Sequence, residues 1–527
     1  MTEPLATGSS WWELIDERAR LTPDRPFLSD ERGRRLTFGE LRDCAAATAA
    51  GLQELGITAD DVVSWQLPTT LEAPVLMAAL SRLGARQNPI IPILRRAEVR
   101  LITSQLDSRW LIVPGTHRGF DYVEMANEAV AGSHCTVMDA SQWATDTDGM
   151  ALPSRDASML SANVDPGDAH DRARDLVRWY YYSSGTTATA KGVKHTDRSA
   201  MAGSNAHIAY HGLQEDDLLP APFPITHIGG LVQLTSYLRV GARMLLMDGF
   251  DPSASPILMA ERGATRLGSA TPFFRAYLAA QRRHGHTPLF PKLRQLHAGG
   301  APISPELNTE CIRVLGRPIV NAWGLTEFPV ATSLSPVDPP EKFNGTVGRM
   351  APHVELKVVG IDGNVVAEGG EGELWVRGPQ LCHGYVDSAL DADAFDADGF
   401  FRTGDLGAVD AEGFVRITGR LKDVIIRNAE NLSAQEIEDV LAEHPAIADV
   451  AVVGVPDPKT GERACAIVVL ASGHESIAIP ELAEHCTAAG LAKQKIPEQL
   501  VIVGELPRNP MGKVLKHVLR TQVAPTS

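Results

Sequence analysis

Cysteine is scarce in this 527-residue sequence, and its six cysteines include no C-x-x-C pair. They are Cys44, Cys135, Cys311, Cys382, Cys465 and Cys486. This scattered spacing favours reduced thiols over a disulfide framework or a zinc site.

Long apolar runs and an excess of positive charge are also lacking. No uninterrupted apolar run reaches the roughly 18–20 residues that a transmembrane helix needs. The first residues, "MTEPLATGSSWWELIDERAR", show no basic segment followed by an apolar core, so we expect no signal peptide. The net charge of −16 argues against nucleic acid as the main partner, because phosphate backbones select basic surfaces. We therefore expect a cytoplasmic protein without integral membrane association.

The sequence does contain enough apolar material for more than one core. It is 44% hydrophobic and 22% charged, which is ordinary for a globular protein. A chain of 527 residues exceeds what a single core usually supports, so we expect two or more domains.

Helix and strand patterns alternate near the N-terminus. "LTFGELRDCAAATAAGLQELGI" predicts an amphipathic helix whose capping box is Thr37 and Glu40. "DVVSWQL" and "RQNPIIPI" predict strands on either side of a helix over "LEAPVLMAALSRLGA". This order predicts an α/β fold with a parallel sheet covered on both faces. The polar stretch from about Ala129 to Asp175 predicts a surface segment with few strands.

A domain boundary is predicted near Gly419–Lys422. After it, "DVIIR", "ADVAVVGVPD", "ACAIVVLA" and "QLVIVGELP" predict short strands. Helices are predicted from Ser433, with Glu436 closing a second capping box, and near Pro480. We expect domains at 1–420 and 421–527, the second a compact α+β unit.

The stretch "YYYSSGTTATAKGVKHT" places a hydroxyl-rich loop between a predicted strand, "LVRWYYYSS", and a predicted helix, "DRSAMAGSNAHIAYHG". Glycine lets the backbone approach a ligand, successive N–H groups can cradle an anion, and Lys191 adds a positive charge. The loop therefore suits a polyphosphate, although a solvent-exposed Ser/Thr loop is the alternative. Its spacing matches neither a Walker A loop nor a Rossmann glycine motif. The candidate ligands are Ser183, Ser184, Gly185, Thr186 and Thr187.

Five further segments follow this loop: "HAGGAPIS", "NAWGLTE", "FRTGDLG", "ITGRLKD" and "NPMGKVLKHVL". Together with the loop they resemble, in order, the motifs of the adenylate-forming superfamily, which contains acyl-CoA synthetases, firefly luciferase and peptide-synthetase adenylation domains. The loop pattern of that family is roughly [YF]-T-S-G-[TS]-T-G-x-P-K-G, from which this chain departs at Ala188 and Ala190. The resemblance covers nearly the whole chain. It implies a large domain of αβα layers with a β-barrel-like subdomain, followed by a small mobile α+β domain.

The resemblance implies a nucleotide site. Trp323 would stack on adenine, Thr326 would bond the α-phosphate and Glu327 would ligate Mg²⁺, a cation that prefers oxygen ligands. Asp405 would bind the ribose hydroxyls and Arg420 would contact ribose and phosphate. The other nucleotide-binding candidates are Gly299, Gly300, Ala301, Pro302, Asn321 and Gly324. Taken singly, the Gly-Pro segment is more typical of a plain turn and a lone glutamate is usually a surface residue, while a turn aspartate is the alternative for Asp405.

Reaction and motion follow from the same resemblance. Lys513 would be the catalytic lysine, acting with Thr326, Glu327 and Lys191, and Lys422 would be the hinge about which the small domain swings. The reaction joins a carboxylate to ATP, giving acyl-AMP and pyrophosphate, and then transfers the acyl group to coenzyme A. ATP, Mg²⁺ and CoA are therefore the expected cofactors, and a homodimer is one oligomeric state that we consider.

The acid and the acceptor are less sharply defined. His227, Gly300, Trp323 and Leu325 are candidate walls of the acyl pocket, with His227 favoured as a gating residue over a general base. The segment "RQNPIIPILRRAEVRLITSQLDSRWLIVPG" is similar to cyclohexanecarboxylate-type ligases, which points to an alicyclic, aromatic or medium-chain acid.

A departure bears on the CoA site, which is expected at Asn428, Ala429 and Glu430. The family usually reads GGENI-x-P here, whereas this chain reads "NAENLSA". The methyl group of Ala429 would narrow the pantetheine tunnel, while Asn428 tolerates left-handed backbone. Two alternatives stay open: loading of a carrier-protein thiol, and a non-catalytic nucleotide-binding homologue.

Overall fold

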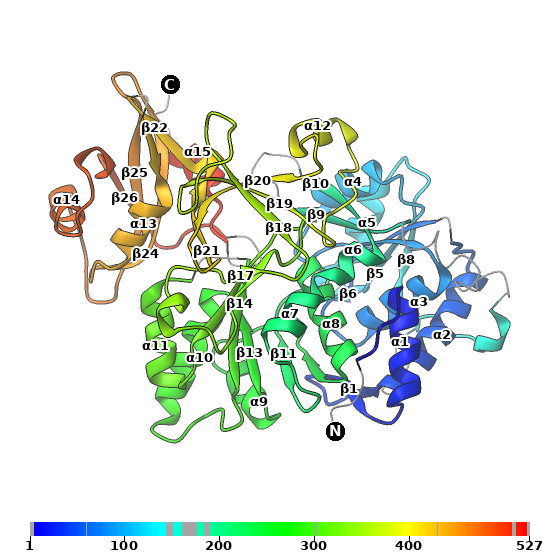
Figure 1. Ribbon diagram of the computed structural model, residues 1–527. Helices are drawn as coiled ribbons and strands as arrows, with labels where there is room; N and C mark the ends of the chain where they lie inside the picture. The colour runs from blue at the N-terminus through cyan, green and yellow to red at the C-terminus, as the bar shows by residue number, and fades with distance from the viewer. Residues whose placement is uncertain are drawn as a thin grey trace.

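The computed structural model describes residues 5–59, 61–143, 151–160, 176–183, 190–300, 303–428, 430–508 and 513–523. Figure 1 shows a large lobe, coloured blue to yellow, and a small C-terminal lobe, coloured orange to red. In the described part of the chain, no helix is long and apolar enough to cross a bilayer. The cytoplasmic location stays a prediction.

The first sheet of the large lobe has the order β10-β9-β4-β3-β5-β8. All its neighbours pair in parallel except β9 and β10, which are antiparallel. The strands are β3 (Val62–Trp65), β4 (Arg86–Pro89), β5 (Trp110–Val113), β8 (Thr136–Asp139), β9 (Val177–Ser183) and β10 (Lys191–Thr196). The predicted parallel sheet is thus confirmed.

Helices cover both faces of this sheet. The side chains of β9 alternate: Trp179 and Tyr181 join the core that includes residues of α1, α2 and α3, whereas Tyr180 joins the core that includes residues of α4 and α5. The helices are α1 (Trp11–Leu21), α2 (Phe38–Glu54), α3 (Glu72–Leu83), α4 (Arg96–Gln105) and α5 (Tyr122–Val130). The capping box predicted at Thr37 and Glu40 is present at the start of α2.

Two further sheets complete the αβ part of the large lobe, with orders β11-β12-β1-β2 and β13-β14-β15-β16-β17. Their strands are β1 (Pro26–Asp30), β2 (Arg35–Thr37), β11 (Leu218–Ala221), β12 (Arg243–Leu246), β13 (Arg266–Ser269), β14 (Gln295–Gly299), β15 (Ile319–Trp323), β16 (Thr332–Ser333) and β17 (Arg349–Met350). The helices that accompany them are α6 (Asp197–Ala202), α7 (Ser204–Tyr210), α8 (Ile228–Val240), α9 (Ser255–Glu261), α10 (Thr271–His284) and α11 (Pro305–Leu315). A short hairpin, β6 (Thr116–His117) and β7 (Phe120–Asp121), lies outside these sheets.

An antiparallel sheet, β18-β19-β20-β21, forms the subdomain next to the small lobe. Its strands are β18 (Glu355–Val359), β19 (Gly372–Arg377), β20 (Phe401–Val409) and β21 (Val415–Arg420), and α12 (Asp391–Ala394) precedes β20. The proposed domain boundary after Arg420 falls between β21 and a single 3₁₀ turn, η8 (Leu421–Asp423).

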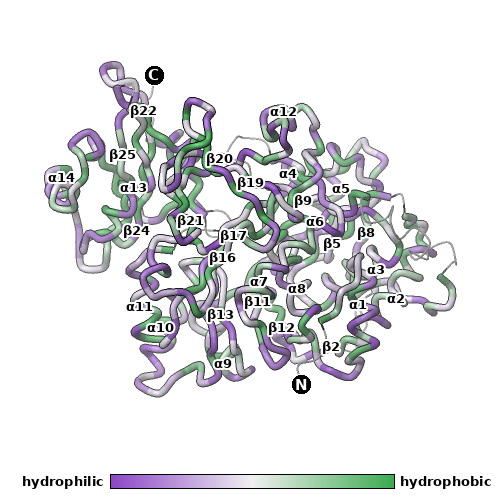
Figure 2. The backbone as a smooth tube through the Cα atoms, in the orientation of Figure 1, coloured by the Kyte–Doolittle hydropathy of each residue, from purple (hydrophilic) through white to green (hydrophobic). Residues whose placement is uncertain are grey.

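The small lobe is built on a five-stranded sheet in which β23, β22, β25 and β24 are neighbours and β26 pairs with β25. The elements are β22 (Val424–Arg427), β23 (Glu430–Ser433), α13 (Ala434–Ala442), β24 (Ile447–Asp457), β25 (Gly461–Leu470), α14 (Ile479–Ala488), β26 (Gln499–Ile502) and α15 (Lys516–Val523). The middle of β25 is fully buried, and Figure 2 shows apolar backbone colouring along β24 and β25. The four strands predicted here are confirmed.

Within its described residues, the strand-poor segment from Ala129 to Asp175 holds one short strand, β8, which extends the first sheet at its edge. The structure corrects three local predictions. The residues after Lys191 form β10 rather than loop. The helix predicted over "DRSAMAGSNAHIAYHG" is split at Gly203, where a Cβ would lie 2.8 Å from Val232 and 3.0 Å from the carbonyl oxygen of Pro329.

The third correction concerns the second capping box. The Ser433 hydroxyl accepts the Glu436 N–H at 3.3 Å, so half of the box is present. The Glu436 carboxylate, however, bonds to Lys495 at 2.6 Å instead of reaching back to the cap. A long-range ion pair has therefore replaced the local bond.

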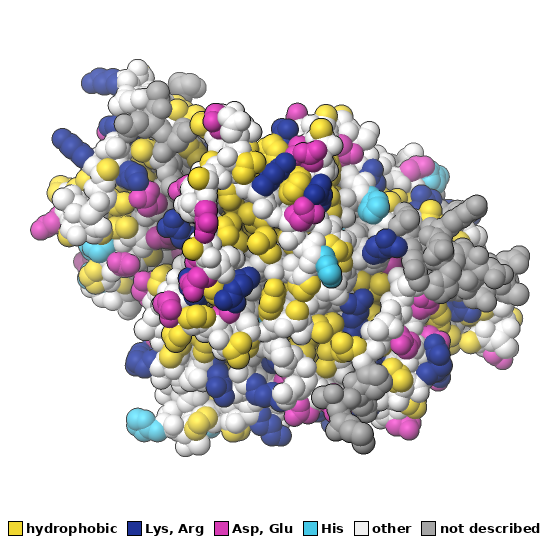
Figure 3. All heavy atoms as spheres, in the orientation of Figure 1, with side chains coloured by type: hydrophobic (Ala, Val, Ile, Leu, Met, Phe, Trp, Pro, Cys, Tyr) yellow, Lys and Arg dark blue, Asp and Glu magenta, His cyan; other side chains and the backbone are white. Residues whose placement is uncertain are grey.

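Hydrogen bonds also join the two lobes. Arg275 on α10 donates to the Ala448 carbonyl oxygen at 3.1 Å, and the Ser433 hydroxyl donates to the Thr418 carbonyl oxygen at 2.6 Å. On the face in Figure 3, positive and negative side chains are interspersed rather than gathered by sign.

Candidate active site

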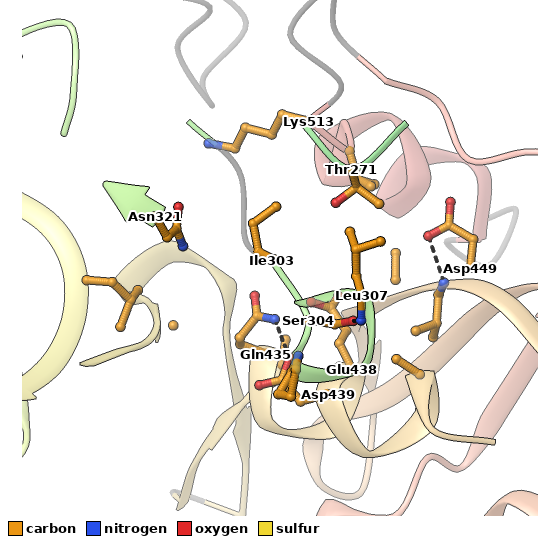
Figure 4. A pocket seen from close by; sticks show the side chains of 18 of the residues that line it. Thr271, Ile303, Ser304, Leu307, Asn321, Gln435, Glu438, Asp439, Asp449 and Lys513 are labelled. Carbon is orange, nitrogen blue, oxygen red and sulfur yellow. Dashed lines mark hydrogen bonds between the residues drawn. The ribbon is translucent and has the colours of Figure 1, made fainter. Parts of the chain in front are cut away.

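A cavity of about 830 Å³ lies between the two lobes. Several predicted site residues line it: Gly300, Asn321, Trp323, Gly324, Asp405, Arg420, Lys422 and Lys513. Figure 4 shows Asn321 on the large-lobe side and Lys513 extending into the cavity from the small lobe, with Gln435, Glu438 and Asp439 of α13 below. Residues that are almost 200 positions apart in the sequence therefore face one space.

Asp405 is one of the acidic residues that line this cavity, and it is 2% exposed. Asp405 and Arg420 are paired across β20 and β21, and Arg420 Nε lies 2.7 Å from Asp405 Oδ1. The indole N–H of Trp323 donates to Asp405 Oδ2 at 2.8 Å. Gly404, which precedes Asp405 in β20, has a φ of +70°, in the left-handed region that favours glycine. The carboxylate is thus oriented by both neighbours and keeps lone pairs for further donors.

Lys422 and Lys513 are two of the basic residues that line the cavity. Burial and the nearby Arg420 and Lys513 lower the pKa of Lys422 to about 7. Burial and Arg420 lower the pKa of Lys513 to about 8. Because these neighbouring cations destabilise one another, the part of the cavity around Arg420, Lys422 and Lys513 favours an anion. Arg520 on α15 bonds Asp423 at 2.7 Å and the Lys422 carbonyl oxygen at 3.2 Å, in the turn where the hinge is predicted.

Thr326 and Glu327 lie in a separate, tightly held turn and do not line the large cavity. The Thr326 carbonyl oxygen is 2.8 Å from Nε2 of His195, a fully buried residue on β10. Burial lowers the pKa of His195 to about 4, so the ring is neutral and Nε2–H donates this bond. Glu327 Oε1 accepts a hydrogen bond from the Tyr385 hydroxyl at 2.8 Å.

Sequence reasoning missed His195 and Tyr385. His195 follows the loop motif by a few residues, and Tyr385 lies in "LCHGYVDS", which carries no recognised chemical pattern. Lys191, the first residue of β10, places its Nζ 5.4 Å from the centre of the Tyr385 ring. Tyr385 therefore lies between two predicted catalytic residues, Lys191 and Glu327.

The predicted acyl-pocket residues do not converge on one cavity. His227 and Thr326 border a second, water-sized space, whereas Gly300 and Trp323 line the large cavity and Leu325 lines neither. His227 caps α8, because its Nδ1 accepts the Gly229 N–H at 3.2 Å. Burial lowers its pKa to about 4, which suits a neutral packing or gating residue.

The remaining predicted residues are covered only in part. Gly299 ends β14, and Asn428 has the left-handed φ of 52° that the sequence suggested. Ser184, Gly185, Thr186, Thr187, Ala301, Pro302 and Ala429 lie outside the described residues, as do the side chains of Ser183 and Glu430.

Comparison with known proteins decides the family. The family model "AMP-binding enzyme" matches residues 15–386, and "AMP-binding enzyme C-terminal domain" matches residues 436–513. The chain belongs to the AMP-binding enzyme family. The resemblance to the adenylate-forming superfamily and the predicted α/β fold with two lobes are both confirmed.

Relatives of this AMP-binding enzyme span most of its length. A medium-chain fatty-acid–CoA ligase of Escherichia coli is 30% identical over 524 residues, covering 98% of this chain and 90% of the relative. A salicyl-AMP ligase/salicyl-S-ArCP synthetase of Mycobacterium tuberculosis is 34% identical over 536 residues, covering 98% and 91%. The crystal structure of ATP-bound MatB from Rhodopseudomonas palustris matches with a TM-score of 0.82 at 26% identity, covering 98% of this chain and 99% of MatB. The crystal structure of apo MatB matches with a TM-score of 0.73 at 25% identity and the same coverage.

Proposed function

We propose that this AMP-binding enzyme is an ATP-dependent acid–thiol ligase. It activates a carboxylic acid as acyl-AMP with release of pyrophosphate, and then transfers the acyl group to CoA. The observation that supports this most is the meeting of Lys513 with Asp405 and Arg420 in one cavity between the lobes. The higher similarity to ATP-bound than to apo MatB supports a lobe arrangement suited to the adenylation step.

The residues present meet the electrostatic demand of that step. A carboxylate must attack the α-phosphorus of a polyanion, so repulsion has to be offset. Lys513 and Arg420 supply fixed positive charge in the cavity, and the Asp405 carboxylate can accept ribose hydroxyls. Preorganised donors aimed at developing charge are usually the largest catalytic contribution.

Mg²⁺ fits the turn at Glu327. This carboxylate is 8% exposed, and one of its oxygens is held by a neutral donor, Tyr385, rather than by a cation. A carboxylate combined with substrate phosphates is the usual protein site for Mg²⁺, so Glu327 would hold the ion that neutralises phosphate charge. Thr326 and Lys191 would complete the phosphate contacts.

CoA is the proposed acceptor, and rotation of the small lobe about Lys422 would exchange the two half-reactions. The left-handed Asn428 preserves the turn in which the family carries glycine. A carrier-protein thiol is the second candidate, favoured by the 34% identity to a relative named for loading ArCP. For the acid we propose an alicyclic, aromatic or medium-chain carboxylate, which is compatible with the medium-chain relative.

Pyrophosphate release tests this proposal. The purified chain is mixed with MgATP and a panel of alicyclic, aromatic and medium-chain acids, each with and without CoA. We expect acid-dependent pyrophosphate in at least one case and a thioester only when CoA is added. Pyrophosphate without thioester would favour the carrier-protein alternative, and no pyrophosphate with any acid would contradict adenylation.

A further inference from the structure

Tyr385 is a buried residue whose hydroxyl donates a hydrogen bond to the carboxylate of Glu327. It is 3% exposed, and its hydroxyl donates to Glu327 Oε1 at 2.8 Å. Within the described residues, no hydrogen bond reaches the second oxygen of Glu327, Oε2. Tyr385 thus holds one oxygen of the carboxylate, and no described residue bonds the other.

The backbone around Tyr385 is anchored from two directions. It forms an antiparallel bridge with Val193 on β10, and its N–H donates to Asp391 Oδ1 at 2.8 Å. The preceding Gly384 has a φ of +82°, and a Cβ there would lie 2.5 Å from Asp391 Oδ2. The position of the tyrosine hydroxyl is therefore set by sheet pairing and a tight turn.

The same segment also holds the backbone of the turn that carries Glu327. The Cys382 N–H donates to the Glu327 carbonyl oxygen at 2.9 Å, while His195 Nε2 donates to the Thr326 carbonyl oxygen. These bonds hold the main chain of the turn and do not reach the carboxylate of Glu327. Among the described residues, Tyr385 alone bonds that carboxylate end.

We propose that Tyr385 is a positioning residue: its hydroxyl holds Oε1 of Glu327 and so presents Oε2 to the metal ion of MgATP. This inference rests on the proposed function, in which Glu327 is the Mg²⁺ ligand. Hydrogen bonds to ligating carboxylates orient them, and their loss typically costs about 10–100-fold in metal affinity or activity.

Tyr385→Phe is a selective variant. It removes one oxygen and keeps the ring that packs beside Lys191. The matched control is Tyr122→Phe, because Tyr122 is 5% exposed and donates to the Pro92 carbonyl oxygen at 2.9 Å, outside the proposed site. Thermal melting of both variants reports any loss of folding.

The test is the metal dependence of nucleotide binding, without any acid. The dissociation constant of α,β-methylene-ATP is measured by calorimetry in EDTA and in Mg²⁺, and their ratio gives the advantage conferred by the metal. We expect Tyr385→Phe to lower this ratio by about 10-fold, with metal-free affinity unchanged, and Tyr122→Phe to leave it unchanged.

A double-mutant cycle shows whether Tyr385 acts through Glu327. In a Glu327→Ala background, Tyr385→Phe should produce no further fall in the ratio. An unchanged ratio in Tyr385→Phe, or an equal fall without Glu327, would overturn the proposal. Because no acid is used, these outcomes are separate from the pyrophosphate test of the overall function.

Discussion

The indole N–H of Trp323 donates to Asp405 Oδ2 across 2.8 Å, which joins the end of β15 to β20. Arg420 lies 2.7 Å from the other oxygen of the same carboxylate. The aromatic ring and the carboxylate, which the proposed function assigns to adenine and ribose, are therefore placed as one unit rather than independently.

Trp323→Phe should weaken ATP binding although it keeps an aromatic ring. The substitution removes the donor to Asp405, and a hydrogen bond to a charged group contributes about 1.5–3 kcal/mol, so we expect a rise of about 10- to 100-fold in the ATP dissociation constant. Equilibrium binding of a fluorescent ATP analogue measures it. Trp12→Phe on α1 is the control, since that half-buried ring lies outside the cavity. Equal affinities for wild type and Trp323→Phe would show that the bond does not matter for the nucleotide.

Lys513→Ala should slow adenylation far more than the second half-reaction. Loss of one preorganised donor to a charged transition state typically costs about 10²–10³ in rate, so we expect at least ~10²-fold slower acyl-AMP formation in a single turnover. Thioester formation from supplied acyl-AMP should continue. An unchanged adenylation rate would refute the role of Lys513.

ATP binding should draw protons from solution at pH 8. The pKa of Lys513 is lowered to about 8 and that of Lys422 to about 7, so both are partly neutral there. A triphosphate stabilises the charged forms and raises both pKa values, so protons are taken up and affinity falls as pH rises. Calorimetry in buffers of different ionisation enthalpy measures the uptake. Below about pH 6 both amines are already charged, so the uptake should vanish. Lys513→Met should reduce it at pH 8, and heats independent of buffer would contradict the assignment.

Acid should destabilise the large lobe through its buried histidines. Burial lowers the pKa of His195 and of His207 to about 4 and that of His297 to about 3, from 6.5. Between about pH 6.5 and pH 4 the unfolded chain therefore binds more protons than the folded chain. The contribution of these histidines to the free energy of unfolding is complete above about pH 6.5 and falls as the pH decreases toward 4. A histidine whose pKa is lowered from 6.5 to about 4 contributes about 2 kcal/mol less to the free energy of unfolding at pH 5 than at pH 7.

Urea unfolding of His207→Asn at pH 7 and pH 5 checks this, because the variant should lose part of that pH dependence. The exposed His286, replaced by asparagine, is the control. The idea fails if His207→Asn and wild type lose equal stability between the two pH values.

Much of the fold could be predicted because its signals are local. The capping box of α2 needs only Thr37 and Glu40, and the small-lobe strands follow from short apolar runs between turns. The predictions that failed depend on distant partners. The Glu436 carboxylate bonds to Lys495 instead of to the start of its own helix. The strand β10 forms because its backbone pairs with β9 and with the segment around Tyr385.

The site shows the same division. Motif residues such as Asp405, Arg420 and Lys513 could be selected from the sequence because each motif marks one residue type at one spacing. His195 and Tyr385 could not, since a histidine that donates to a carbonyl and a tyrosine that steadies a glutamate leave no pattern of their own. Their importance lies in contacts across 131 and 58 residues of chain.

Because Arg520 grips both Asp423 and the Lys422 carbonyl, α15 is fastened to the turn about which the small lobe would pivot. A rotation at that turn would therefore move α15 together with it. The distance between a dye on the exposed face of α15, for example at Thr521, and a second dye on α11 should therefore differ between the two half-reactions.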